Sequence, residues 1–168
     1  MKSVLIPALA LAATTAVADP QIDEARIMVV VSSIPMAVDL AAYDLAERAF
    51  ADPVVIDYTS LWGGDPTTMS PAALMDAWRG IVPGFDATHH ALSNIEVTIS
   101  NDVANATADV DGRHWIDGDL WRPIGTYHWD LVKVSDDWKV TRMVFDMTEE
   151  IGSRDLAARA MERVAESQ

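Results

Sequence analysis

The first half of the chain shows helical periodicity. From Gln21 to Asp39, apolar residues recur every three or four positions, which places them on one face of a helix. Pro35 lies within this segment, and we expect it to kink the helix or divide it. A short helix is predicted at 43–50 and a strand at 54–58. Another helix is predicted from Ser70 to about residue 81, begun by a serine cap followed by proline.

The second half changes to period two. Short polar links join consecutive alternating segments, so neighbouring strands are expected to be antiparallel. A final helix is predicted from Ser153. This order predicts an α+β domain with helices on one face of a curved antiparallel sheet, whose apolar inner face lines a core or a pocket. The four predicted strands span residues 88–100, 103–115, 121–134 and 138–147.

The N-terminus resembles a secretory signal. Lys2 precedes an apolar stretch, and Ala16-Val17-Ala18 provides a small-x-small cleavage pattern before Asp19. We therefore predict a cleavable signal peptide at 1–18, one domain at 19–150 and a C-terminal helix at 151–168. The mature protein is expected to be periplasmic or secreted and not to be held in a membrane. The alternative is a buried N-terminal helix.

Composition narrows the function. The chain has 168 residues, no cysteine and a net charge of -14. The length suits one domain. Without cysteine there is no disulfide, thiol nucleophile or cysteine-bearing metal site. The negative charge argues against binding nucleic acid, anionic membranes or polyanionic substrates. We expect the partner to be a small molecule or another protein.

Candidate chemistry centres on two histidines and two further polar residues. His90 and His114 lie on neighbouring predicted strands, and imidazole exchanges protons near neutral pH. Asp39 lies on the apolar side of the first helix, where a buried carboxylate needs a partner such as a histidine. Tyr58 ends the first strand and offers a phenolic donor for a carbonyl or enolate oxygen.

Each of these residues also has a purely structural interpretation. Asp39 is equally suited to a cap or a tether, and Tyr58 to a core aromatic with its hydroxyl at the rim. His89 and His128 are interpreted as structural residues. No HExxH motif or close ligand spacing indicates a metal, so no metal site is predicted.

The chain resembles the SnoaL-like branch of the nuclear transport factor 2-like (NTF2-like) superfamily and, within it, the scytalone dehydratases. The resemblance spans about 27–148. Asp39 matches the family's helix-borne aspartate, and Ile56-Asp57-Tyr58 matches its strand motif. Thr88-His89-His90 matches a Thr-x-His motif, and His114 falls at the second histidine.

The resemblance implies a cone-shaped fold, with the sheet wrapped around N-terminal helices and a deep pocket. It implies a small hydrophobic, often cyclic ligand, no cofactor, and a homodimer or homotrimer. Carried over, His90 and His114 would transfer protons, Asp39 would orient one imidazole, and Tyr58 would act on the carbonyl. Departures are Val38, where the dehydratase has a tyrosine, and Tyr127, near an expected asparagine. The predicted substrate-binding residues are Trp62, Trp78 and Tyr127.

Three functions remain open. The first is a cofactor-independent lyase or isomerase that moves a proton α to a carbonyl on a small hydrophobic ring compound. The second is an exported small-molecule-binding protein that uses the same cavity without chemistry. The third is a dimerising scaffold that pairs through the outer sheet face, which Trp121 and Trp129 could serve. The six tryptophans are otherwise expected mostly in the core or the pocket wall.

Overall fold

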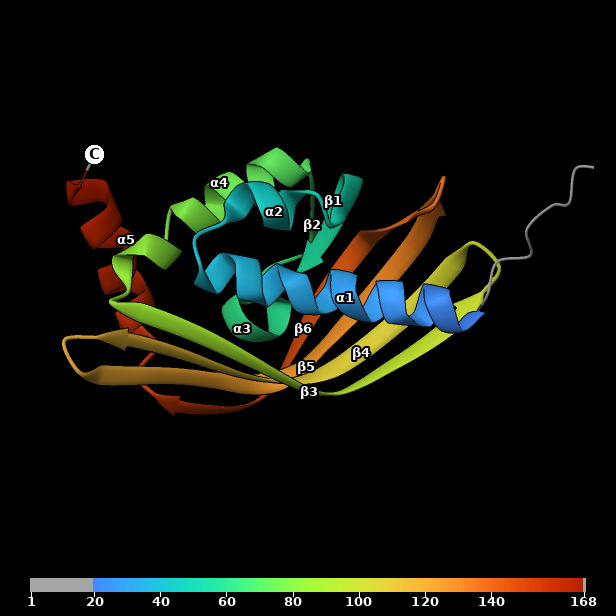
Figure 1. The fold of residues 1–168 in the computed structure, drawn as a ribbon. Helices are drawn as coiled ribbons and strands as arrows, with labels where there is room; N and C mark the ends of the chain where they lie inside the picture. Colours follow the sequence, from blue (N-terminus) through green and yellow to red (C-terminus); the bar gives the residue numbers. More distant parts are fainter. Residues whose placement is uncertain (1–19, 168) are drawn as a thin grey trace, which may run out of the picture.

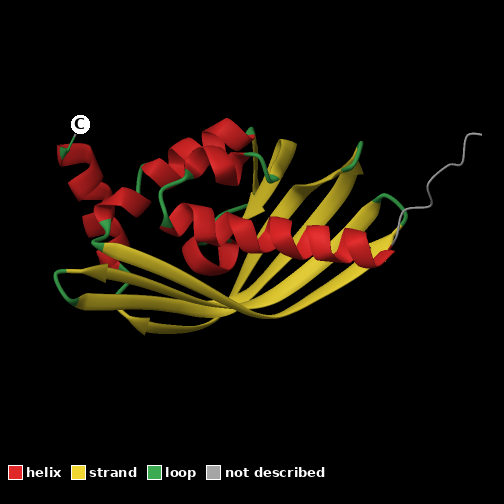
Figure 2. Ribbon diagram, in the orientation of Figure 1, coloured by secondary structure: helices red, strands yellow, loops and turns green. Residues whose placement is uncertain are grey.

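A curved six-stranded sheet wraps around the helices in the computed structural model, which describes residues 20–167 (Figures 1 and 2). The strand order is β2-β1-β6-β5-β4-β3. This arrangement confirms the predicted α+β class. The predicted signal peptide lies outside the described residues. Among the residues that are described, no helix is long and apolar enough to cross a membrane.

Strands β3 to β6 form the predicted antiparallel meander. Buried and half-buried positions alternate along β4 and β5, as expected for strands with one face against a core. The sixth strand extends further than predicted, to Gly152. The strands are β1 (Phe50–Asp57), β2 (Thr67–Met69), β3 (Ala87–Ser100), β4 (Val103–Ile116), β5 (Asp119–Val134) and β6 (Asp137–Gly152).

Two features of the sheet were not predicted. Strand β1 pairs in parallel with β6, so the sheet is mixed. The short strand β2 pairs with the other edge of β1, in a stretch too brief to show any periodicity. Its addition places the segment between Gly63 and Met69 beside the sheet, where several of its residues line the cavity described below.

Helix α1 (Pro20–Asp39) is continuous through Pro35, so of the two expected effects of the proline, a kink or a division, the division is wrong. Ile34 and Ala37 on either side of the proline are fully or almost fully buried. We infer that this packing holds the helix together despite the missing N–H of proline. The helix lies across the sheet, with Asp39 at its C-terminal end (Figure 1).

The other helices are short and surround the open side of the sheet. Helix α2 is shorter than predicted because Phe50 pairs in β1. Helix α4 begins as predicted, since the Ser70 hydroxyl accepts a hydrogen bond from the Ala73 N–H at 3.2 Å. The helices are α2 (Tyr43–Glu47), α3 (Thr59–Trp62), α4 (Pro71–Arg79), the 3₁₀ turn η1 (Val82–Gly84) and α5 (Asp155–Glu166).

The core lies between α1 and the inner sheet face. Trp129 is 1% exposed and Trp121 is 2% exposed, so both belong to the core, as expected for most of the tryptophans, and the alternative that places them on the outer sheet face is wrong. Odd-numbered residues of β5 point toward the helices, whereas even-numbered residues such as His128 point outward. Alanines at 104, 106 and 108 on β4 are small enough to let α1 approach the sheet.

Helix α5 closes one end of the cone. It buries Leu156 and Ala160 and packs against η1. A Cβ at Gly84 would lie 1.9 Å from the Ala160 carbonyl oxygen, so only glycine permits this approach. Arg163 adds ion pairs to Asp86 at 2.8 Å and to Asp117 at 3.0 Å. The C-terminal helix is therefore packed against the domain and forms part of the cavity wall.

Candidate active site

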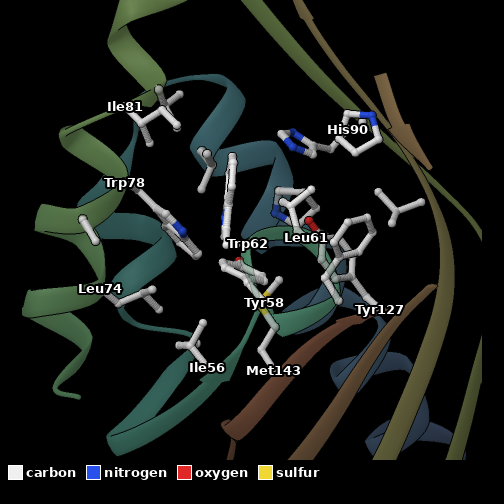
Figure 3. A pocket seen from close by; sticks show the side chains of 18 of the residues that line it. Ile56, Tyr58, Leu61, Trp62, Leu74, Trp78, Ile81, His90, Tyr127 and Met143 are labelled. Carbon is white, nitrogen blue, oxygen red and sulfur yellow. The ribbon is translucent and has the colours of Figure 1, made fainter. Parts of the chain in front are cut away.

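A cavity of about 410 Å³ lies between the inner sheet face and the helices (Figure 3). Its walls are mainly apolar and aromatic, and α1, α3, α4, α5, η1 and all six strands contribute to it. All but one of the predicted site residues line it. They are Tyr58, Trp62, Trp78, His90, His114 and Tyr127.

Asp39, the remaining predicted residue, lies directly behind His90. Its carboxylate contacts the His90 Nδ1 at 2.7 Å, the His90 backbone N–H at 2.7 Å and the Thr88 hydroxyl at 2.8 Å. The side chains of Asp39 and His90 are 13% and 14% exposed. The end of α1 and the beginning of β3 therefore hold one imidazole through a carboxylate with three hydrogen bonds.

The protonation of this pair follows from its contacts. Burial raises the pKa of Asp39, but the hydrogen bonds and charge of His90 and the hydroxyl of Thr88 outweigh it, so the pKa is lowered overall. An ionised carboxylate only accepts hydrogen bonds, so the His90 Nδ1 carries a proton and donates it. The His90 Nε2 is left as the nitrogen that can meet a ligand.

His114 lies beside His90 on the neighbouring strand. The ring centroids are 5.0 Å apart and the planes are nearly perpendicular, at 84°. The ring of His114 also contacts Phe85 at 4.9 Å and Trp121 at 4.8 Å between centroids. The structure therefore brings both predicted histidines together, inside an aromatic enclosure.

The environment keeps His114 neutral. Burial, followed by the charge of the neighbouring His90, lowers the pKa of His114 to about 3. A backbone hydrogen bond at Trp121 and the charge of Asp39 only partly oppose this shift. The Nδ1 atom of His114 is buried without a hydrogen-bond partner. At neutral pH this imidazole is an uncharged hydrogen-bonding group.

Two tyrosines add neutral phenols to the cavity. Burial raises the pKa of Tyr58 well above its usual value, and a hydrogen bond with Trp78 only partly opposes this. The hydroxyl of Tyr58 lies 4.0 Å from the Met143 sulfur, a weak acceptor (Figure 3). Burial likewise raises the pKa of Tyr127. Both side chains stay protonated at neutral pH, and Tyr58 can donate to a ligand oxygen.

Helices α3 and α5 each contribute an exposed, large apolar side chain to the cavity wall. Trp62 and Met161 line the cavity although they are 46% and 47% exposed. Trp62 lies against Trp121 with centroids 5.7 Å apart, and the Arg154 guanidinium lies over its other side at 5.7 Å. The exposed part of the cavity wall therefore includes large apolar side chains as well as polar residues such as Asp65 and Thr67.

The other two histidines, which were interpreted from the sequence as structural residues, do not line the cavity. The side chain of His128 is 45% exposed and contacts Asp146 at 3.2 Å, and that of His89 is 59% exposed. Within residues 20–167, no three His, Asp or Glu side chains form a group that could hold a metal ion.

Sequence reasoning missed several residues of the site. Phe85 follows a proline-glycine turn and Gly112 lies within a strand, where neither position carries a local signal of a cavity. The role of Thr88 as a third donor to Asp39 was visible only as part of a motif. Trp121 was left open between the core and the outer sheet face, and it lines the cavity. Each of these residues is identified by contacts between distant parts of the chain.

Residues 21–144 match the SnoaL-like domain family. The Kfla4162 protein from Kribbella flavida has a similar solved structure, with 30% identity and a TM-score of 0.79, covering 83% of this chain and 99% of that one. No curated protein matches the sequence.

Two further solved structures are similar in fold. A protein from Novosphingobium aromaticivorans, provisionally named a scytalone dehydratase, has 20% identity and a TM-score of 0.71, covering 80% of this chain and 89% of that one. A protein from Streptomyces avermitilis, provisionally named a dehydratase of the NTF2-like family, has 12% identity and a TM-score of 0.64, covering 74% and 96%. The predicted NTF2-like fold is confirmed.

Proposed function

This chain belongs to the SnoaL-like domain family, and we propose that it is a cofactor-independent lyase or isomerase. Its substrate would be a small hydrophobic ring compound, from which it removes a proton α to a carbonyl. The observation that carries this proposal is the Asp39–His90 pair, joined at 2.7 Å, with the imidazole on the wall of an apolar cavity. A base held in one tautomer on the wall of a mainly apolar pocket is suited to abstracting a proton from carbon.

The proposed reaction begins at the His90 Nε2. This nitrogen takes the α-proton, and the C–H electron pair moves toward the carbonyl oxygen to form an enolate. Tyr58 donates a hydrogen bond to that oxygen, where negative charge develops. The resulting imidazolium is stabilised by the ionised Asp39.

The enolate has two possible fates. In a lyase, the electron pair returns to form a carbon–carbon double bond and expels a β-hydroxyl group, which receives the proton from His90 and leaves as water. In an isomerase, His90 returns the proton to another carbon of the conjugated system. The low pKa of His114 favours His90 as the proton carrier, so we assign His114 the role of a neutral hydrogen-bond partner for the departing oxygen.

Proton exchange in heavy water tests the proposal. The protein is incubated with a panel of cyclic ketones and β-hydroxyketones, and loss of the α-proton is followed by NMR. We expect exchange or elimination with the wild type and at least a 100-fold slower rate with His90→Ala, since acid–base catalysis contributes about 10²–10⁴-fold. His128→Ala removes an exposed histidine and should match the wild type. Equal rates in wild type and His90→Ala would contradict the assignment.

A binding protein without catalysis is the second candidate, favoured by the size and apolar walls of the cavity. It predicts that a ligand stays bound through purification and that binding tolerates His114→Ala. Mass spectrometry of an organic extract of the purified protein would detect this ligand. Absence of proton exchange across the panel, together with a retained ligand, would favour this function over the enzyme.

A further inference from the structure

Gly112 occupies the position between the two imidazoles of the cavity. It pairs with His90 across β3 and β4, and His114 follows on the same strand and the same face. Gly112 is buried and lines the cavity. A side chain at this position would therefore project between His90 and His114.

The space at Gly112 is limited by both rings. A Cβ atom there would lie 3.3 Å from Cδ2 of His90 and 3.5 Å from Cε1 of His114. It would also lie 3.3 Å from the carbonyl oxygen of Pro123 on β5. Contacts near 3.3 Å are closer than carbon atoms prefer, since their optimum is about 3.5–4.0 Å. An added methyl group would have to displace at least one neighbour slightly.

The local backbone conformation does not itself require a glycine. The φ angle of Gly112 is not in the left-handed region, so an alanine fits the local conformation. Glycine weakens a strand through its backbone entropy and packs no side chain. What Gly112 provides is clearance beside the two imidazoles and the Pro123 carbonyl oxygen.

We propose that Gly112 is a positioning residue, which leaves the His90 ring free to keep its hydrogen bond to Asp39 while its other nitrogen faces the cavity. A methyl group at this position pushes against the Cδ2 edge of His90, which adjoins Nε2. Small displacements matter here because proton abstraction requires close alignment of the base with the substrate. The effect of Gly112 on turnover rests on the proposed function, but the effect of Gly112 on the position of the His90 ring does not.

The test compares Gly112→Ala with Gly80→Ala. Gly80 caps α4 and does not line the cavity, and a Cβ there would meet a backbone oxygen at the same 3.3 Å. In folded Gly112→Ala we expect displaced ¹⁵N signals of the His90 ring and a weakened Nδ1–H resonance. Gly80→Ala should reproduce the wild-type histidine signals. Unchanged His90 signals in folded Gly112→Ala would overturn the proposal.

Proton exchange provides the second measurement. Gly112→Ala should lower kcat at least tenfold with KM within about threefold, because the methyl group misaligns the base rather than filling the pocket. Unchanged kcat in a variant with displaced His90 signals would overturn the positioning role. If wild type and variants all fail to exchange protons, the proposed function fails, and the His90 signals still decide whether Gly112 positions the ring.

If Gly112→Ala does not fold, the same substitution can be tested in a protein that also carries His90→Ala. Removing the imidazole removes the nearest side-chain obstacle to the methyl group. We expect Gly112→Ala to be better tolerated with His90→Ala than alone, measured as the change in Tm in each background. An equal loss of folded protein in both backgrounds would show that the obstacle is not His90, and would overturn the proposal.

Discussion

The burial of His114 predicts an acid-sensitive contribution to stability. Replacing it with phenylalanine removes a titrating group but keeps a ring between Phe85 and Trp121, with centroids now 4.9 and 4.8 Å away. Burial lowers the pKa of His114 from its usual 6.5 to about 3 in the folded protein. In the unfolded chain the residue should titrate near its usual value.

Proton uptake by His114 determines whether the protein becomes more or less stable as the pH falls. Below pH 6.5 the unfolded chain binds a proton at His114 and the folded protein does not, so stability falls as the pH falls until about pH 3. Each pH unit within this window corresponds to about 1.4 kcal/mol for one proton. Between pH 7 and pH 5 the loss is about 2 kcal/mol, because titration is incomplete near pH 6.5. Asp39 does not contribute in this range, since its pKa is lowered below 3.8.

Urea unfolding at pH 7, 6 and 5, followed by tryptophan fluorescence, measures this difference. The free energy of unfolding of the wild type should fall by about 2 kcal/mol more than that of His114→Phe between pH 7 and pH 5. The comparison uses the change with pH, so a constant packing difference between the two proteins cancels. His128→Phe alters an exposed histidine and should retain the wild-type slope. Parallel slopes for wild type and His114→Phe would refute the burial of a neutral imidazole.

Three other predictions follow from the same structure. Asp39→Asn should lower kcat at least about 100-fold in the heavy-water exchange assay. The amide of asparagine can donate a hydrogen bond to the His90 Nδ1, which favours the tautomer with the proton on Nε2. An unchanged rate would exclude Asp39 as the orienting group. Tyr58→Phe should lower kcat about 10–100-fold, because the phenol that donates to the enolate oxygen is lost. A modest fall in Tm is expected, because the hydroxyl contacts the Met143 sulfur at 4.0 Å and bonds with Trp78; a large fall in Tm with unchanged kcat would indicate a structural role. If the protein is exported, N-terminal sequencing of the mature form should begin at Asp19, and an intact Met1 on the exported protein would contradict the predicted cleavage.

Local patterns were sufficient for most secondary structure. The strands of the meander follow from alternation, and helix α4 follows from its serine cap. The errors occurred where packing overrides a local preference. Pro35 remains inside a continuous helix, and Phe50 joins β1 rather than the preceding helix. In both places a neighbour buried in the core has more influence than the intrinsic tendency of the residue.

For the candidate site as well, some features could be predicted from the sequence and others required the structure. Residue types and motifs were enough to identify His90, His114, Asp39 and Tyr58, but not their contacts. The hydrogen bond between His90 and Asp39 joins residues 51 positions apart. Gly112 shows no chemical signal of its own, and its importance appears only when β3 and β4 place it beside both imidazoles.

By itself, the sequence determined where the longer helices and the strands of the meander form and which of their residues share a face, because these depend on spacing along the chain. Only the tertiary structure decided which face lies inside, as Trp121 and Trp129 show by pointing into the cone. It also decided that His114 is neutral, because burial removes the water that would stabilise its charge. Burial from water and contact between distant segments arise only when the whole chain is folded, so the spacing of residues along the sequence does not predict either.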